Sequence, residues 1–249
     1  MPKAYRTSIT THVEGKPHVY GYDLTKLAGA KSFSAAIYLV LKGEMPGAEA
    51  EKMLDAILTI SIDHGVEPAS VVAARNIYSG GSPVQAAVAG GILALGEYHG
   101  GAIEAAMENF AAYQDRGPEA LIADFKAKDK RVAGFGHKLY ERDPRTERLI
   151  ELAREFGFEG KYVELAKGVE EALRQAQGKN LPLNIDGIIA ALLLEMGFDS
   201  KVGKGIFIIA RTPGLVAHVV EEATRGKPVR RLSEEDVEYD GPNPRDFDN

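Results

Sequence analysis

Apolar residues recur at helical spacing in one segment of this chain after another, and glycine or proline separates the segments. Met53, Leu54 and Ile57, for example, fall on one side of a predicted helix. Strand-like residues are confined to 7–22, a Thr-, Val- and Tyr-rich stretch interrupted by Gly15, which predicts one small hairpin. Because strands and helices do not alternate, the sequence predicts an all-α fold of about ten or more helices.

Several helix starts can be predicted from local residue chemistry. Ser82, Asp143 and Thr212 are each followed by proline, a pattern typical of an N-cap before the first helical position. The helix predicted to start after Thr212 is expected to end at Gly226. The polar, acidic residues 233–249 predict an extended or partly ordered tail.

The chain has 249 residues, no cysteine and a formal net charge of −6. It therefore has no disulfides, thiolate nucleophile or Cys-ligated zinc, and the spacing of its histidines predicts no metal site. The acidic balance argues against nucleic-acid binding. The longest strongly apolar run, Ile188–Leu194, is far shorter than the ~20 residues of a membrane span. We expect a soluble, cytoplasmic protein, because residues 1–15 do not resemble a secretory signal.

His99 precedes two glycines and a helical pattern in the string GEYHGGAIEAAM. At a helix N-terminus the dipole disfavours the imidazolium, so the ring would stay neutral. A neutral ring can donate one N–H to an oxygen on which negative charge develops, while Gly100 and Gly101 let a substrate approach the backbone. The alternative is a simple turn between two helices.

His137 follows a glycine-rich loop in the string GFGHKLYERDPR, which ends at Arg145 in the first turn of a predicted helix. This arrangement predicts an imidazole near a guanidinium that can hold a carboxylate with two parallel hydrogen bonds.

Asp186 stands at the head of an apolar helix in the string LPLNIDGIIAALL. Such a carboxylate is either an N-cap or a general base at the mouth of an apolar pocket, and both alternatives stay open.

Other polar residues have two interpretations each. His64, Arg211 and Arg225 lie at the edges of predicted helices. Each is either a polar group in a cleft or an ordinary surface residue. A basic cluster before the glycine loop and one lysine before Asp186 indicate a phosphate-bearing ligand or a solvated face: Lys126, Lys128, Lys130, Arg131 and Lys179. The remaining histidines are interpreted as structural or exposed: His12, His18 and His218.

Taken in order, these strings resemble the citrate synthase family over roughly residues 20–232. GYDLTKLA followed by SFSAAIYLVLKGEMP is similar to the early segment of that family. The three catalytic motifs then follow in chain order, at His99, at His137 to Arg145, and at Asp186.

The short length resembles one branch of the family, the citryl-CoA lyases, which includes the C-terminal lyase module of ATP citrate lyase. The strings IDHGVEPAS, GGAIEAAM and NIDG look like that branch. His99 instead matches the synthases, since the ATP citrate lyase module typically has an aromatic residue at that point.

The resemblance implies a role for each matched residue. His99 would stabilise the enol or enolate of acetyl-CoA at the thioester carbonyl. Asp186 would move the proton at the acetyl methyl carbon, and His137 would bind the oxaloacetate carbonyl. The other matched residues would bind substrate: His64, Arg145, Arg211 and Arg225 the dicarboxylate, and Lys179, Lys126, Lys128, Lys130 and Arg131 the CoA phosphates.

The resemblance also implies a large helical domain, residues 1–99 and 192–249, and a small helical domain, residues 100–191, with the active site between them. Arg225 would reach into a second subunit, so a homodimer is the minimum and a homotetramer the larger alternative. No metal or cofactor beyond the CoA thioester substrate is implied. A citryl-CoA synthetase is a candidate partner.

Three functions remain open. The first is a citryl-CoA lyase that releases acetyl-CoA and oxaloacetate. The second is a compact citrate synthase, or a relative that uses another 2-oxo acid. The third is a non-catalytic module that senses CoA or citrate, against which the intact His99, His137 and Asp186 argue.

Overall fold

The computed structural model describes residues 5–97, 99–136, 142–177 and 181–247. They are mostly helical, which confirms the predicted all-α class. The strands are β1 (Thr10–Val13), β2 (Lys16–Val19) and β3 (Tyr22–Asp23). The helices are α1 (Leu24–Leu27), α2 (Phe33–Lys42), α3 (Ala48–Ile60), α4 (Ala69–Ser79), α5 (Val84–Leu93), α6 (Ala102–Tyr113), α7 (Pro118–Ala127), α8 (Pro144–Glu155), α9 (Lys161–Gln177), α10 (Ile185–Glu195) and α11 (Gly203–Arg225), with 3-10 turns η1 (Ser200–Val202) and η2 (Glu234–Asp236).

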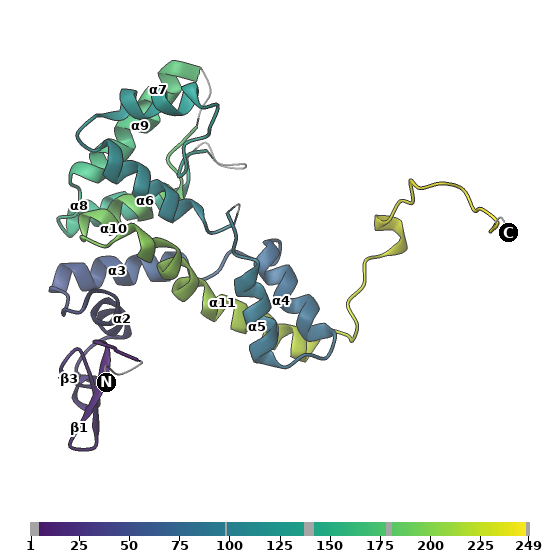
Figure 1. The fold of residues 1–249 in the computed structure, drawn as a ribbon, viewed down its shortest axis with the longest axis horizontal. Helices are drawn as coiled ribbons and strands as arrows, with labels where there is room; N and C mark the ends of the chain where they lie inside the picture. Colours follow the sequence, from purple (N-terminus) through teal and green to yellow (C-terminus); the bar gives the residue numbers. More distant parts are fainter. Residues whose placement is uncertain (1–4, 98, 137–141, 178–180, 248–249) are drawn as a thin grey trace.

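The three strands form a small antiparallel sheet in the order β1-β2-β3. Thr10 pairs with Val19, and Glu14 and Gly15 make the intervening turn with positive φ. The predicted hairpin is confirmed, and the short strand β3 adds to it. Figure 1 shows this sheet projecting beyond α2 at one end of the molecule.

The larger buried cluster surrounds α10, whose residues 187–193 are buried without interruption. It includes side chains of α2, α3, α6 to α9 and the first half of α11. A helix that is apolar on all sides is expected at the centre of such a core.

A second, smaller cluster joins α4 and α5 to the second half of α11. Gly91 lets α5 approach α4 closely, because a Cβ there would lie 2.9 Å from the carbonyl oxygen of Ser70. The expectation that small residues after Pro83 permit close helix packing is confirmed. Figure 1 shows α11 running from the lobe of α6 to α10 toward the α4–α5 pair.

The prediction that a helix starts after Thr212 is wrong, because Pro213 lies inside the continuous helix α11. Interior proline costs a helix ~3 kcal/mol or more. Both halves of α11 are nevertheless buried, Phe207 in the first cluster and Leu215 in the second. Thr212 Oγ1 also donates to the carbonyl oxygen of Ile208 at 2.7 Å. Packing on both sides of the proline therefore keeps the helix unbroken.

Two further predicted helix starts have different outcomes. Asp143 caps α8 as predicted, and its side chain accepts from the backbone N–H of Arg145. Ser82 does not cap α5: Pro83 is the N-cap residue, Val84 is the first helical residue, and no side chain caps the helix.

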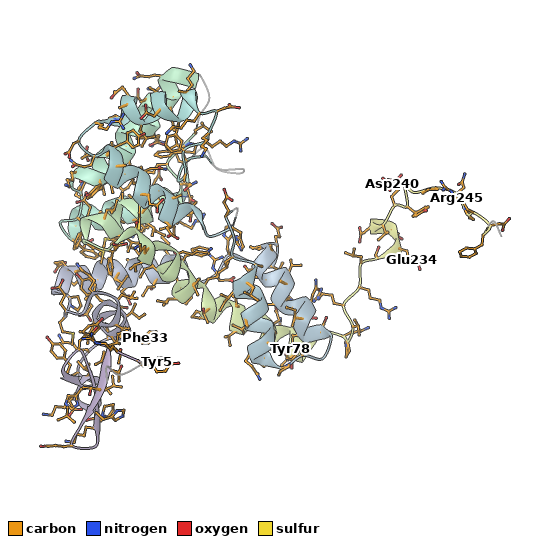
Figure 2. The ribbon with its side chains drawn as sticks, viewed as in Figure 1. Tyr5, Phe33, Tyr78, Glu234, Asp240 and Arg245 are labelled. Carbon is orange, nitrogen blue, oxygen red and sulfur yellow. The ribbon has the colours of Figure 1, made fainter. Side chains whose placement is uncertain are left out.

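The C-terminal segment after α11 extends away from the helices, as Figure 1 shows. Residues 231–247 are exposed throughout and contain only the turn η2. In Figure 2 the labelled residues Glu234, Asp240 and Arg245 lie along this segment, far from the helical body. The predicted extended tail is confirmed for its described residues. No described helix is long and apolar enough to cross a membrane.

Candidate active site

His99 lies two residues before Gly101, the N-cap of α6, so its predicted place near a helix start is confirmed. Its Nε2 is 2.8 Å from the hydroxyl of Ser70, a fully buried residue in the first turn of α4. Phe207 of α11 packs edge-on against the ring, with the two centroids 6.4 Å apart. A Cβ at Gly100 would lie 2.7 Å from Phe207, so glycine is needed for this approach.

The pKa of His99 is lowered from 6.5, chiefly by burial, and further by electrostatic interaction with Arg211 and with His64. The sequence predicts a neutral ring from the dipole of the helix that follows His99. The structure gives the same direction with a different cause, which is desolvation of the ring near the guanidinium of Arg211. A neutral imidazole can donate a hydrogen bond to a developing oxyanion without carrying charge itself.

Arg211 is the buried cation of the site, with 4% of its surface exposed. Its guanidinium lies 4.7 Å from the ring centroid of Phe207, and its Nε donates to the carbonyl oxygen of Ser61 at 3.0 Å. Burial lowers the pKa of Arg211, Asp63 and Asp186 raise it, and Arg145 lowers it. The groups around this one charge therefore come from the loop after α3, from α8 and from α10.

Arg145 is held rigidly by Asp143, which is 1% exposed. Its Nε donates to Oδ1 at 3.0 Å and its Nη2 to Oδ2 at 2.8 Å, a bidentate pair. Its Nη1 lies 3.4 Å from Nδ1 of His64, which comes from the loop between α3 and α4. Because a guanidinium can only donate, Nδ1 of His64 accepts and the ring proton sits on Nε2.

The N-cap interpretation of Asp186 is wrong, because Asn184 is the N-cap of α10. The side-chain oxygen of Asn184 accepts from the backbone N–H groups of Asp186 and Gly187, at 3.0 and 3.1 Å. The carboxylate of Asp186 is therefore not consumed by capping, and it interacts electrostatically with Arg211. It also has contacts beyond these.

The glycine loop is fastened to the start of α10 at several points. Asn184 Nδ2 donates to the carbonyl oxygen of Gly136 at 3.0 Å, and the backbone N–H of Gly136 donates to Pro182. Gly134 and Gly187 touch directly, since a Cβ on Gly187 would lie 2.4 Å from the oxygen of Gly134. This contact fixes the loop that leads into His137.

The predicted site residues fall into three groups. The structure brings together His64, His99, Arg145, Asp186 and Arg211, through the interactions given above. His137 and Lys179 lie outside the described residues. Arg225 and the basic cluster stand apart: Lys126, Lys128, Lys130 and Arg131 are exposed around the end of α7, and Arg225 is exposed at the end of α11.

Sequence reasoning missed three residues that shape the site, Ser70, Phe207 and Asn184. A serine in the first turn of a helix and a phenylalanine in an apolar stripe carry no distinctive signal. Asn184 could have been recognised, since Asn two residues before Asp186 is as good an N-cap as Asp.

The arrangement offers a neutral imidazole from the loop before α6, a carboxylate from α10, and two guanidinium groups from α8 and α11. Such groups can polarise a carbonyl, move a proton on the adjacent carbon and hold carboxylates. This is the chemistry of making or breaking a carbon–carbon bond next to a carbonyl.

Comparison with known proteins assigns the chain to one class. The family model of the citrate synthase C-terminal domain matches residues 46–232. The chain therefore belongs to the citrate synthase family.

Solved structures extend the comparison. A citryl-CoA lyase from Hydrogenobacter thermophilus is 45% identical with a TM-score of 0.94, and the match covers 98% of each chain. ATP citrate lyase from Methanothrix soehngenii, solved with citrate and coenzyme A, is 25% identical with a TM-score of 0.84, and 42% of that chain is covered.

Curated sequences add two kinds of relative. Citrate synthase of Heyndrickxia coagulans is 31% identical over 77% of this chain, and ATP-citrate synthase beta chain protein 1 of Arabidopsis thaliana is 32% identical over 76%. The chain spans about half the length of the first (52%) and about a third of the second (34%).

Proposed function

We propose that this protein is a citryl-CoA lyase-type enzyme, which cleaves citryl-CoA to acetyl-CoA and oxaloacetate. The observation that carries the proposal is that His99 and Asp186 both lie close enough to the buried guanidinium of Arg211 to interact with its charge. The similarity to the Hydrogenobacter citryl-CoA lyase along nearly the whole of both chains supports the cleavage direction.

Cleavage requires two proton movements around one carbon–carbon bond. The hydroxyl proton of the citryl group passes to His137 as that bond breaks and the ketone of oxaloacetate forms. The electron pair of the bond becomes the enolate of acetyl-CoA, whose oxygen accepts a hydrogen bond from neutral His99. Asp186, which enters this direction as the carboxylic acid, delivers its proton to the terminal carbon, completes the acetyl group and is left as the carboxylate. After product release, exchange with water removes the proton gained by His137 and restores the one lost by Asp186.

The mechanism needs the tautomer of His99 in which the ring nitrogen that faces Ser70 accepts a hydrogen bond. When the Ser70 hydroxyl donates to Nε2, the ring proton sits on Nδ1, and Nδ1 is the nitrogen that donates to the thioester oxygen. His64, Arg145 and Arg211 would hold the carboxylates of oxaloacetate by charge-assisted hydrogen bonds.

The CoA phosphates would be bound by the basic residues near the glycine loop, namely Lys126, Lys128, Lys130, Arg131 and Lys179. The described members of this set are exposed, as groups that meet a solvated diphosphate would be. No cofactor beyond the CoA thioester is needed for these steps.

A homodimer is proposed as the minimum assembly, with a homotetramer as the larger alternative. Arg225 follows Arg211 by fourteen residues on α11, which is about 21 Å along the helix axis and beyond the reach of an arginine side chain. In the proposed dimer, Arg225 would instead serve the site of the second copy. Exposed apolar residues on α11 and on the neighbouring helix α5, including Val220 at 51% and Leu93 at 85% exposure, would supply a surface for that contact.

We further propose that residues 100–191 move as a small domain against residues 1–99 and 192–249. His64 is exposed, so closure would cover it and exclude water from the enolate. A cytoplasmic location, a role beside the tricarboxylic acid cycle and a citryl-CoA synthetase partner accord with this chemistry.

A compact citrate synthase is the second candidate, favoured by His99, the residue that the synthases carry at this point. A synthase must hydrolyse the thioester as well as form the carbon–carbon bond, and it therefore releases free thiol. The two activities therefore differ in hydrolysis of the thioester, which only the synthase carries out.

The deciding experiment supplies purified protein with citryl-CoA and follows acetyl-CoA by chromatography and oxaloacetate by a coupled NADH assay. Release of both products is expected. A parallel reaction with acetyl-CoA and oxaloacetate is monitored for free thiol. Thiol release without citryl-CoA cleavage would replace the lyase with a synthase, and absence of both activities would exclude both enzymes.

A further inference from the structure

One face of α11 holds the loop that carries His64. Arg211 donates to the carbonyl oxygen of Ser61, as described above. One turn later, Gly214 lies against the loop backbone, since a Cβ there would lie 2.5 Å from the oxygen of Ile62. Two turns after Arg211, Nε2 of His218 is 3.0 Å from a carboxylate oxygen of Asp63.

Positions i, i+3 and i+7 share one face of a helix, so Arg211, Gly214 and His218 form a continuous stripe. The stripe contacts three successive residues of the loop, 61 to 63. The loop is therefore fixed by α11 immediately before His64.

Asp63 connects that stripe to His64. Its Oδ1 contacts His218, and its Oδ2 accepts from the backbone N–H of Gly65 at 3.0 Å. Burial raises the pKa of Asp63, but hydrogen bonds from the backbone N–H groups of Gly65 and His64 and the nearby His218 lower it overall. The ionised carboxylate thus fixes the backbone on both sides of His64.

We propose that His218 is a positioning residue that, through Asp63, directs the His64 ring toward Arg145. The sequence pattern marked His218 only as structural or exposed, yet its side chain is just 13% exposed and faces two carboxylates. One is Asp63, and the other is Glu221, 4.0 Å from Nδ1 and itself 3.3 Å from Arg75. The inference rests on the proposed function, in which His64 and Arg145 bind the dicarboxylate.

Two substitutions of His218 separate positioning from packing. His218→Gln keeps an N–H donor near the place of Nε2, whereas His218→Leu keeps much of the volume and removes the donor. His12→Leu, in the exposed hairpin, is the matched control. Ring ¹⁵N shifts of His64, measured without substrate, report whether its proton stays on Nε2, and calorimetric titration with oxaloacetate reports dicarboxylate affinity.

We expect the His218→Leu variant to lose the single His64 tautomer. It should bind oxaloacetate roughly ten- to a hundredfold more weakly, a loss typical of removing a supporting hydrogen bond. The KM for citryl-CoA should rise more than kcat falls. His218→Gln and His12→Leu should keep the wild-type spectrum and affinity.

Unchanged His64 shifts and affinity in His218→Leu would overturn the proposal, and so would equal losses in the Gln and Leu variants. Should His218→Leu not fold, Asp63→Asn tests the same link, and an unchanged His64 spectrum in that variant is equally contrary. If the wild-type protein does not cleave citryl-CoA but the His64 spectrum still responds to His218→Leu, the proposed function fails and the positioning role stands.

Discussion

The hydroxyl of Ser70 lies 2.8 Å from Nε2 of His99, and Ser70 is fully buried. When this buried hydroxyl donates to Nε2, the ring proton sits on Nδ1. In the proposed mechanism, stabilisation of the charge on the thioester oxygen by His99 therefore depends on Ser70.

Ser70→Ala should lower kcat for citryl-CoA cleavage by about 10²-fold, a loss typical of a misdirected oxyanion donor. The far-ultraviolet circular dichroism spectrum should be unchanged, and ring ¹⁵N shifts should show His99 in mixed tautomers. Ser79→Ala, at the other end of α4, is the control and should keep wild-type kcat. A fully active Ser70→Ala variant would contradict this role.

The lowered pKa of His99 predicts a pH dependence of stability. The unfolded chain binds a proton at His99 more readily than the folded chain does, so the free energy of unfolding should fall as pH drops below 6.5. Urea titrations of the wild type and of His99→Asn between pH 7.5 and 5 measure the difference. The variant should show the shallower decline, and parallel curves would refute the assignment.

Arg145→Ala should weaken oxaloacetate binding by about 1.5–3 kcal/mol, the size of a charge-assisted contact. The structure adds a second effect: buried Asp143 loses two hydrogen bonds, so the free energy of unfolding should fall by about 1–3 kcal/mol. Arg148→Ala, an exposed pair partner of Glu151 on the same helix, should change either quantity by less than about 0.5 kcal/mol. Wild-type affinity for oxaloacetate in Arg145→Ala would exclude Arg145 from the site.

Asp186→Ala should reduce turnover by orders of magnitude with little change in the melting temperature, because Asp186 does not cap α10. Asn184→Ala, which removes the N-cap of α10, should instead lower the free energy of unfolding by about 1 kcal/mol. Turnover and thermal melts of both variants measure the contrast. An active Asp186→Ala enzyme would remove the proton-transfer role, and His137→Ala should be as inactive as Asp186→Ala.

Gly187→Ala should separate the glycine loop from α10, since the added Cβ would lie 2.4 Å from the oxygen of Gly134. Both kcat and the melting temperature should fall. Gly205→Ala, in α11 where a Cβ meets nothing within 4 Å, should instead stabilise the protein by about 0.5–1 kcal/mol. Calorimetric melts that rank the two variants alike would contradict the close contact.

The sequence allowed the fold class and most helices to be predicted, because apolar spacing and caps such as Asp143 are local signals. It failed at Pro213, where local chemistry predicts a helix start and burial of both flanks overrides it. It also failed at Asp186, because two capping residues stand two positions apart and only one can be used.

The polar residues of the site were predictable as single groups and not as pairs. His99, Arg145 and Asp186 stand in distinctive strings, whereas their partners Ser70, Asp143 and Asn184 contact them through tertiary structure or local geometry. The link from His218 to Asp63 spans 155 residues and has no local signal.

Helix α11 belongs to both buried clusters, with Ile206 and Phe207 in one and Leu215 and Val219 in the other. Arg211 sits between them, at the boundary. Heat cannot unfold either cluster without disturbing α11, the helix that both clusters share. Thermal unfolding and loss of activity should therefore occur at the same temperature. We therefore expect no partly unfolded state in which one half of the protein has melted and the site in the other half still works.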